Sequence, residues 1–246
     1  MTEMNMIESL NSALDNMLEE HDNVVIFGED VGYFGGVFRV TDGLQAKHGA
    51  NRVFDAPLAE GGIAAIAFGM GINGLRPVAE IQFADYIFPA YDQIVNEIAK
   101  IRHRSGGEFS TPVTIRTPAG GGIKGGHHHS QSPESQFTHT PGLKVVYCSN
   151  PNNAKGLLTS AIESNDPVIF FEPKRCYRGP FYGDPHNVPT WKGHPKAEVP
   201  EGHYAIPLEK AEVVMEGDAC TVIAWGAMVH VAEQGIKDSG VNAELI

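Results

Sequence analysis

The feature that most constrains the fold is an alternation, repeated along the chain, of short apolar runs with segments of helical periodicity. Residues 24–28, with the sequence VVIFG, are the first such run. Runs without polar positions are typical of parallel strands that are covered on both faces. Further strands are expected at residues 77–83, 112–116, 143–148 and 168–171.

Segments with an apolar position every three or four residues separate these runs. Residues 6–20 carry such a stripe, and helices are also expected at residues 60–72, 85–104 and 154–163. A long irregular loop is expected at residues 117–142, and loops longer than about 12–15 residues inside a domain are usually functional. Strands that alternate with helices favour a parallel sheet with helices on both faces, so we predict an α/β fold.

Proline content divides the chain into three parts. Seven of the 16 prolines lie in residues 173–207, which indicates an extended linker. Residues 1–172 then form the parallel-sheet domain. Residues 208–246 show only a strand, a helix and the start of another strand. Because so few strands cannot cover a sheet, we expect this segment to be the incomplete start of a second α/β domain.

Acidic residues outnumber basic ones by 30 to 18, which gives a formal net charge of −12 at pH 7. Because phosphate contacts need clustered Lys and Arg, this balance argues against non-specific nucleic-acid binding. The cysteines Cys148, Cys176 and Cys220 form no CxxC pair, so neither a disulfide framework nor a structural zinc site is expected. No run reaches the roughly 18 apolar residues of a membrane span, and the acidic first 25 residues resemble neither a signal nor a transit peptide. We therefore expect a cytoplasmic protein with no membrane partner.

Two glycine-rich motifs resemble phosphate-binding loops but lie in the wrong context. Residues 69–74 match GxGxxG, yet they close a helix and precede a strand, whereas the dinucleotide motif follows a strand. Tight helix packing explains these glycines better. In residues 120–125, Lys124 is followed by glycine where a P-loop requires Ser or Thr. We interpret this stretch as a flexible loop that allows close approach to a ligand.

Three consecutive histidines, His127, His128 and His129, follow that loop. In an extended segment His127 and His129 would share a side, but no spaced set of further metal ligands accompanies them. They are either solvated loop residues or include one histidine used as an acid or base, for which a near-neutral pKa is suited. A metal-binding protein built on this run stays an alternative.

Glu60 begins a helix of small residues. Acids at helix N-termini are favoured by the helix dipole, so capping alone would explain it. A carboxylate between an expected strand and a helix could equally face a cofactor. Aromatic residues at the next strand-to-helix junction could pack in the core or line a flat pocket for a heteroaromatic ring. These are Phe83, Tyr86, Phe88 and Tyr91.

Taken together, these residues resemble the β subunit of the thiamine-diphosphate-dependent first component of 2-oxo acid dehydrogenase complexes. The similarity is greatest to the branched-chain enzymes and runs from about residue 6 to the end. Five ordered stretches carry it, at residues 25–31, 56–60, 80–93, 129–134 and 170–174.

The resemblance implies the fold and the partners. The family's β subunit has a transketolase-type pyrimidine-binding α/β domain followed by a second α/β domain. It assembles with an α subunit into a heterotetramer of two α and two β chains. The α chain carries the GDG motif that binds the diphosphate and magnesium, and this sequence contains no GDG. The chain therefore offers half of a thiamine diphosphate site.

The resemblance also implies roles for particular side chains. Glu60 matches the glutamate that hydrogen-bonds the aminopyrimidine ring, where it supports proton removal from the cofactor. His129 matches a histidine at the mouth of the active site that handles the intermediate or the lipoyl group. The other residues expected at the cofactor are Leu58, Gln82, Phe83 and Tyr86. A potassium site formed by backbone carbonyls is expected at Ala161, Ser164 and Asp166.

The implied activity is oxidative decarboxylation of branched-chain 2-oxo acids, with acyl transfer to a lipoyl group of a partner acyltransferase. A pyruvate or acetoin dehydrogenase is an open alternative, because one methylene in an apolar pocket is worth only about 1–3 kcal/mol. Family members continue beyond the end of this sequence. A truncated, inactive subunit that still binds a partner is therefore a second alternative.

Overall fold

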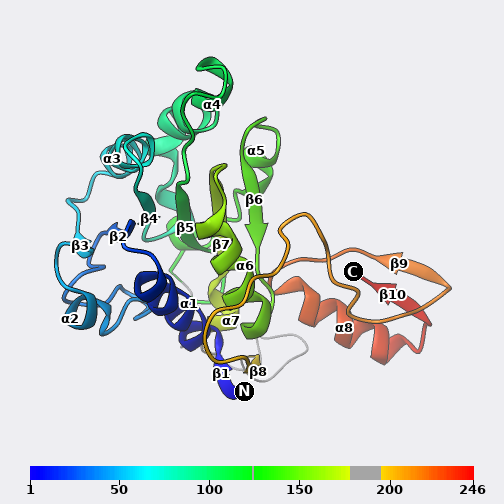
Figure 1. The fold of residues 1–246 in the computed structure, drawn as a ribbon. Helices are drawn as coiled ribbons and strands as arrows, with labels where there is room; N and C mark the ends of the chain where they lie inside the picture. The colour runs from blue at the N-terminus through cyan, green and yellow to red at the C-terminus, as the bar shows by residue number, and fades with distance from the viewer. Residues whose placement is uncertain (124, 178–194) are drawn as a thin grey trace.

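The computed structural model describes residues 1–123, 125–177 and 195–246 (Figure 1). Its centre is a six-stranded sheet in the order β3-β2-β4-β5-β7-β6, and all neighbouring strands are parallel. The strands are β2 (Val24–Gly28), β3 (Val53–Asp55), β4 (Arg76–Glu80), β5 (Thr114–Ala119), β6 (Lys144–Tyr147) and β7 (Val168–Pro173). The predicted parallel sheet is confirmed.

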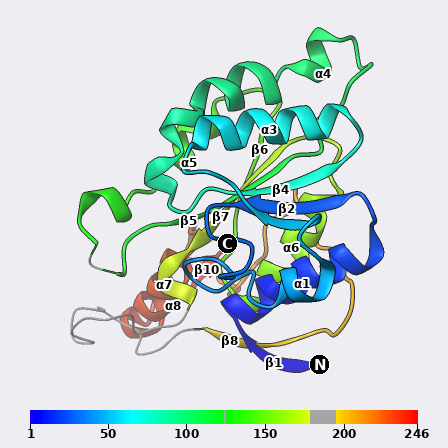
Figure 2. The same ribbon diagram turned by 90° about the vertical axis from the view of Figure 1, so that its left-hand side faces the viewer.

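Helices cover both faces of the sheet (Figures 1 and 2). On one face lie α1 (Met6–Glu20) and α6 (Pro151–Glu163), and on the other lies α3 (Glu60–Ile72). Neighbouring strand residues enter opposite layers, so Phe170 packs with α1 and α6 while Phe171 packs with α3. Burial on both faces explains why the strands contain so few polar residues.

The two helices on the first face begin with matching caps. The Asn5 side chain accepts a hydrogen bond from the Glu8 backbone amide, and the Glu8 carboxylate accepts one from the Asn5 backbone amide, which forms a capping box. Asn150 and Asn153 do the same at α6, where proline occupies the first turn. These caps explain why α6 begins three residues before the start predicted from the apolar pattern.

The single helix predicted at residues 85–104 is wrong. The chain instead forms two 3₁₀ turns, a π-helix and a short α-helix: η1 (Ala84–Tyr86), η2 (Phe88–Ala90), η3 (Gln93–Ile98) and α4 (Ile101–Arg104). Pro89 lies in the second turn and cannot donate a backbone hydrogen bond. In the π-helix the Ala99 amide donates to the Ile94 carbonyl, five residues back.

The predicted irregular loop at 117–142 is partly ordered. Its first three residues extend β5, and it contains η4 (His127–His129) and α5 (Glu134–Thr138). The segment therefore presents the histidines on a short turn at the end of the sheet. Lys124 lies outside the described residues.

Part of the expected linker at residues 173–207 packs against the N-terminus. Strand β8 (Lys196–Val199) pairs antiparallel with β1 (Thr2–Asn5), and α7 (Lys174–Tyr177) directly follows β7. Residues 178–194 lie outside the described part of the chain. The division into domains at 172 and 207 stays a prediction.

The C-terminal segment forms the expected strand–helix–strand unit. It consists of β9 (Cys220–Val222), α8 (Met228–Ser239) and β10 (Ala243–Leu245), and the two strands are parallel. Its apolar cluster is small and joins Val229 and Ile236 of the helix to Ala243 and Leu245 of the last strand.

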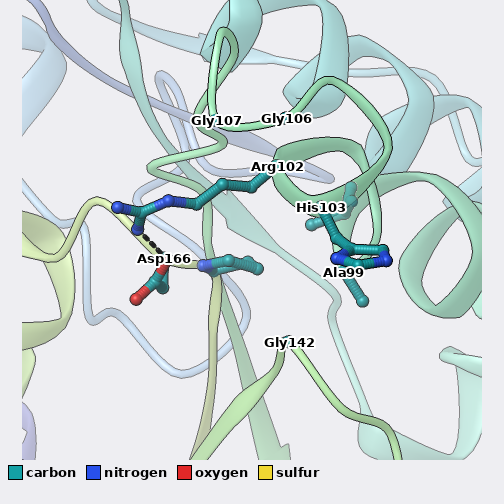
Figure 3. A pocket seen from close by; sticks show the side chains of 9 residues that line it. Ala99, Arg102, His103, Gly106, Gly107, Gly142 and Asp166 are labelled. Carbon is teal, nitrogen blue, oxygen red and sulfur yellow. Dashed lines mark hydrogen bonds and ion pairs between the residues drawn. The ribbon is translucent and has the colours of Figure 1, made fainter.

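A depression of about 380 Å³ lies at the amino-terminal edge of the sheet, beside the turn that follows α4 (Figure 3). An ion pair between Arg102 and Asp166 crosses it. Asp166 lies just before β7, and Gly142, which also lines the depression, lies just before β6. The depression is therefore at the edge of the sheet opposite the carboxyl ends of the strands.

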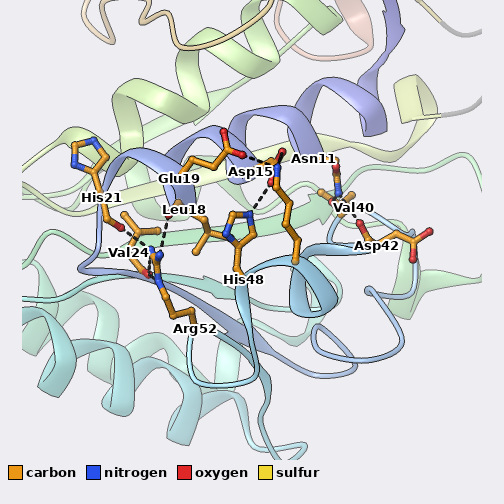
Figure 4. Close-up of polar contacts among 11 residues, drawn as sticks. Asn11, Asp15, Leu18, Glu19, His21, Val24, Val40, Asp42, His48 and Arg52 are labelled. Atoms are coloured by element: carbon orange, nitrogen blue, oxygen red, sulfur yellow. Dashed lines mark hydrogen bonds and ion pairs between the residues drawn. The ribbon is translucent and has the colours of Figure 1, made fainter.

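Arg52 fastens the C-terminus of α1 to the sheet (Figure 4). Its guanidinium donates to the carbonyls of Leu18, His21 and Val24, which lie at the end of α1 and the start of β2. A cation at the last turn of a helix satisfies its unpaired carbonyls and interacts favourably with its dipole. This anchor fixes where β2, and the loop that follows it, emerge from the sheet.

Candidate active site

The carboxyl ends of the parallel strands bring a set of polar side chains to one edge. Glu29 and Asp30 follow β2, Glu60 begins the helix that follows β3, and Gln82 follows β4. Ligand sites in open α/β sheets lie at this edge. The Gln82 amide lies 3.3 Å from an Asp30 carboxylate oxygen, which links the loops after two neighbouring strands.

Two carboxylates, Glu29 and Glu60, form the acidic part of this edge. Glu29 is only 6% exposed. Burial, and after it the negative charges of Glu60, Asp30 and Glu80, raise the pKa of its carboxyl to about 7. Its Oε1 atom is buried and has no hydrogen-bond partner within the described part of the chain. A buried acceptor without a partner is expected where a ligand supplies the missing donor.

The raised pKa of Glu29 predicts how the stability of the isolated chain depends on pH. The folded state holds this proton more tightly than the unfolded state, whose pKa is close to 4.5. The Glu29 contribution to stability is therefore greatest below pH 4.5 and is lost as the pH rises to about 7. In Glu29→Gln, we expect the free energy of unfolding to lack this decrease with rising pH, as measured by denaturant unfolding between pH 4.5 and 8.

The matched control for that experiment is Glu216→Gln, which changes an exposed glutamate. It should keep the wild-type pH dependence. Identical pH profiles for wild type and Glu29→Gln would contradict the assignment.

Phe83, Tyr86 and His129 form an aromatic group at the same edge. The Phe83 and His129 rings meet edge to face with centroids 4.5 Å apart, and the Phe83 and Tyr86 rings are 5.6 Å apart. The Tyr86 hydroxyl lies 3.1 Å from His129 Nε2, while His129 Nδ1 lies 2.9 Å from the Gly125 carbonyl. Because a carbonyl can only accept, Nδ1 carries a proton and donates it. In the neutral ring Nε2 then accepts from Tyr86.

The other two aromatic residues considered from sequence do not join this group. Tyr91 packs against Phe137, with ring centroids 5.5 Å apart, and Phe88 is exposed. Leu58 projects into solvent, with 80% of its surface exposed. Of the four aromatic residues, only Phe83 and Tyr86 lie together at the sheet edge, and Tyr91 packs in the core, which was the other interpretation of the sequence.

A buried ionic network, which the sequence did not reveal, lies beneath the edge. Arg116 of β5 donates from Nε and Nη2 to the two carboxylate oxygens of Glu172 in β7, at 2.7 Å each. Its Nη1 donates to Glu80 of β4, and the Tyr177 hydroxyl donates to Glu172. Desolvation opposes the charge on Arg116, but Glu172 and Glu80 outweigh it and raise the pKa of the guanidinium. Three adjacent strands are thereby tied together under the site.

The GxGxxG-like stretch and the run of three histidines, the two motifs with a structural interpretation, are both ordered in this structure. Within the GxGxxG-like stretch, a Cβ at Gly71 would lie 3.2 Å from Val113, a close contact that favours glycine, whereas a Cβ at Gly69 would meet nothing within 4 Å. The rings of His127 and His128 lie 3.7 Å apart on η4. Residues 1–123, 125–177 and 195–246 contain no group of three or more His, Cys, Asp or Glu that could hold a metal ion.

The carbonyls expected to bind potassium have other partners. The Ser164 carbonyl accepts from Arg76, which also donates to Ile162 and Glu163. The Asp166 carbonyl accepts from the Ser164 hydroxyl, and the Ala161 carbonyl from the Ser164 amide. Each of these carbonyl oxygens keeps a second lone pair. The potassium site at Ala161, Ser164 and Asp166 stays a prediction.

Comparison with known proteins matches this arrangement to one family. The profile of the transketolase pyrimidine-binding domain matches residues 2–180. The chain belongs to this family. The pyrimidine-binding domain thus includes the sheet and every side chain described at its carboxyl edge. The resemblance found in the sequence is confirmed.

Curated relatives match the whole chain. It is 57% identical to the 2-oxoisovalerate dehydrogenase subunit beta of Pseudomonas aeruginosa, over 100% of this chain and 70% of that protein. It is 52% identical to the mitochondrial subunit of the same name from Dictyostelium discoideum, over 99% of this chain and 63% of that one. It is 47% identical to the pyruvate dehydrogenase E1 component subunit beta of Acholeplasma laidlawii, over 98% of this chain and 70% of that one.

A solved structure supports the fold. A split-gene transketolase, described as an inactive β4 tetramer, aligns with a TM-score of 0.71 and 19% sequence identity. The alignment covers 98% of this chain and 69% of the transketolase chain. At this identity the similarity shows the transketolase-like fold alone. Among the described residues, no helix is long and apolar enough to cross a membrane.

Proposed function

We propose that this chain is the β subunit of a thiamine-diphosphate-dependent dehydrogenase of branched-chain 2-oxo acids. The observation that carries the proposal is the 57% identity, over the full chain, to a 2-oxoisovalerate dehydrogenase subunit beta. A second protein of that name follows at 52%, ahead of the pyruvate dehydrogenase relative at 47%. The paired carboxylates Glu29 and Glu60 at the carboxyl edge support it independently.

The residues at this edge fit the pyrimidine half of the cofactor. The Glu29 oxygen without a partner and the Glu60 carboxylate provide acceptors for ring and amino N–H groups. Tyr86 and the buried Phe83 provide an apolar wall. Thiamine diphosphate, when bound, supplies the electron sink that decarboxylation of a 2-oxo acid requires.

This chain's own part in the reaction is to position groups that accept, donate or exchange protons. The Glu60 carboxylate would accept a hydrogen bond from the ring nitrogen of the pyrimidine when that nitrogen carries a proton. Glu29, with a pKa of about 7, exchanges protons near neutral pH at the same place. Tyr86 and Gly125 orient His129 through its two ring nitrogens.

The proposal includes partners. The sequence has no GDG motif, so the diphosphate and magnesium are assigned to an α subunit, in a heterotetramer of two α and two β chains. The acyl group passes to a lipoyl group on an acyltransferase component. Cytoplasmic localisation stays a prediction, since the Dictyostelium relative is named as mitochondrial.

The deciding experiment is dye-coupled oxidation of 2-oxoisovalerate by the chain with its α partner, thiamine diphosphate and magnesium. We expect turnover that requires this chain and that is faster, as kcat/KM, than with pyruvate. Preference for pyruvate or acetoin would move the substrate assignment within the same family. Association of the two chains without any turnover would instead support the inactive partner-binding alternative.

His129→Ala is expected to lower the overall rate, measured with a lipoyl acceptor, more than it weakens thiamine diphosphate binding. The reason is that His129 lies at the open end of the aromatic group and is half-exposed. His128→Ala, which changes an exposed neighbour on the same turn, should leave both quantities unchanged. Lost cofactor binding with an unchanged overall rate in His129→Ala would overturn the assignment.

A further inference from the structure

Asp85 is a buried carboxylate that the proposed reaction does not use. It lies in η1, between Phe83 and Tyr86 in sequence, and is 7% exposed. Its Oδ1 atom accepts hydrogen bonds from the backbone amides of Ser130 and Gln131, both at 3.2 Å. Its Oδ2 atom is buried and lacks a hydrogen-bond partner in the part of the chain that the structure describes.

The two amides that Asp85 binds directly follow His129. Two residues close to Asp85 in sequence contact the same histidine: the Tyr86 hydroxyl lies 3.1 Å from Nε2, and the Phe83 ring, two residues before Asp85, meets the His129 ring edge to face. A single short segment at the end of β4 therefore holds both the side chain of His129 and the backbone just after it.

The chain before His129 is rich in glycine, and it contacts the segment through the carbonyls of Gly125 and Gly126, which accept hydrogen bonds from His129 Nδ1 and the Ser130 hydroxyl. Five of the seven residues from 120 to 126 are glycine, the residue that loses the most conformational freedom on ordering, so fixing this stretch is costly in entropy. After His129, the Gly120 amide donates to the Gln131 carbonyl at 2.8 Å. The Asp85 carboxylate adds two charge-assisted hydrogen bonds at the same place, and such bonds are stronger than neutral ones.

A buried cation accompanies this carboxylate. Lys174 is fully buried; its Nζ atom lies 5.4 Å from the centre of the Phe83 ring and 3.4 Å from the Pro118 carbonyl. Desolvation lowers the pKa of this amine to about 8, and the charge of Asp85 acts in the opposite direction. The negative charge of Asp85 therefore favours the charged form of Lys174.

We propose that Asp85 is a positioning residue: by holding the backbone amides of Ser130 and Gln131, it fixes His129 at the mouth of the active site. Lys174 supplies the compensating charge. The role of His129 in turnover rests on the proposed function, whereas the anchoring of the segment rests on these contacts alone. Because Ser130 is half-exposed and Gln131 exposed, water can satisfy both amides once Asp85 is removed. The loss therefore affects this segment more than the fold.

The test compares Asp85→Ala, Asp85→Asn and the control Asp92→Asn in the full chain. Asp92 is exposed, and its carboxylate accepts from the side chain of Asn96. Amide hydrogen exchange of peptides that contain Ser130 and Gln131 is measured by mass spectrometry. We expect exchange there to rise about tenfold or more in Asp85→Ala. Asp85→Asn, which keeps a neutral acceptor, should lie between wild type and Asp85→Ala, and Asp92→Asn should match wild type.

The catalytic readout is taken on the assembled enzyme with its α partner and a lipoyl acceptor. We expect Asp85→Ala to lower the overall kcat by about tenfold or more while the Kd for thiamine diphosphate changes less than twofold, with partial recovery in Asp85→Asn. Unchanged exchange at Ser130 and Gln131, or exchange that rises evenly over the whole chain, would overturn the proposal. An inactive wild-type enzyme would contradict the proposed function, while the exchange rates would still decide the anchoring.

Discussion

Glu60→Gln is expected to lose about two to four orders of magnitude in the turnover of 2-oxoisovalerate when assayed with the α partner, thiamine diphosphate and magnesium. Glutamine keeps the shape of the side chain and its hydrogen-bonding oxygen, but it cannot exchange a proton at the pyrimidine ring. The measurement is kcat from dye-coupled oxidation at saturating cofactor.

The fold should tolerate this change. Glu60 stands at the first position of α3 and is only half-buried, so the substitution creates no cavity and leaves no charge unpaired. We expect the free energy of unfolding to change by less than about 1 kcal/mol, as is typical of surface substitutions. A variant with normal activity would contradict the role of Glu60, and a variant that unfolds would contradict the local structure.

Glu29 provides a second readout of the same substitution. Burial is the main cause of its raised pKa, and the charge of Glu60 is the next. Glu60→Gln removes that charge, so the Glu29 carboxyl should titrate at a lower pH, measurable by NMR. The control Glu216→Gln, at an exposed site, should leave the titration of Glu29 unchanged. An unchanged titration in Glu60→Gln would show that the two carboxylates are not neighbours.

The sequence predicted the parts of the fold in which local pattern and tertiary packing agree. The bounds of α1 and β2 match those predicted, because an amphipathic stripe and a wholly apolar run lead directly to a helix and a buried strand. The same periodicity could not reveal that η3 (Gln93–Ile98) is a π-helix, since all helix types bury apolar residues at similar spacings. The pairing of β1 with β8 was missed because both are short, partly exposed and nearly 200 residues apart.

In the candidate site, too, some residues could be found from the sequence, whereas others depend on tertiary contacts. Glu60, Phe83, Tyr86 and His129 were found because they lie in ordered stretches that resemble a known family. Asp85 lies in one of those stretches, but its contacts with the loop at 130–131 depend on tertiary structure. A charged residue inside an apolar strand was the one available signal for the buried network, since such residues are almost never fully buried unless they are paired.

Arg116 is the charged residue inside the apolar strand β5, and its replacement is expected to have the largest effect on the free energy of unfolding. It is fully buried and neutralises Glu80 and Glu172, which lie on the strands at either side of β5. Arg116→Met keeps most of the side-chain volume but leaves two carboxylates buried without their cation. Breaking a buried ion pair in this way costs about 3–5 kcal/mol. Denaturant unfolding of the isolated chain at neutral pH measures this loss.

Two further variants separate the loss of charge balance from the loss of packing. Arg102→Met breaks the solvent-exposed ion pair with Asp166 and should cost less than about 1 kcal/mol. Adding Glu80→Gln and Glu172→Gln to Arg116→Met removes the uncompensated charges, so the triple variant should recover part of the stability that Arg116→Met loses. If Arg116→Met cost no more than Arg102→Met, the network would not stabilise the sheet. Because Glu80 is also one of the charges that raise the pKa of Glu29, the triple variant should lower that pKa as well, which would connect the network beneath the sheet edge to proton exchange above it.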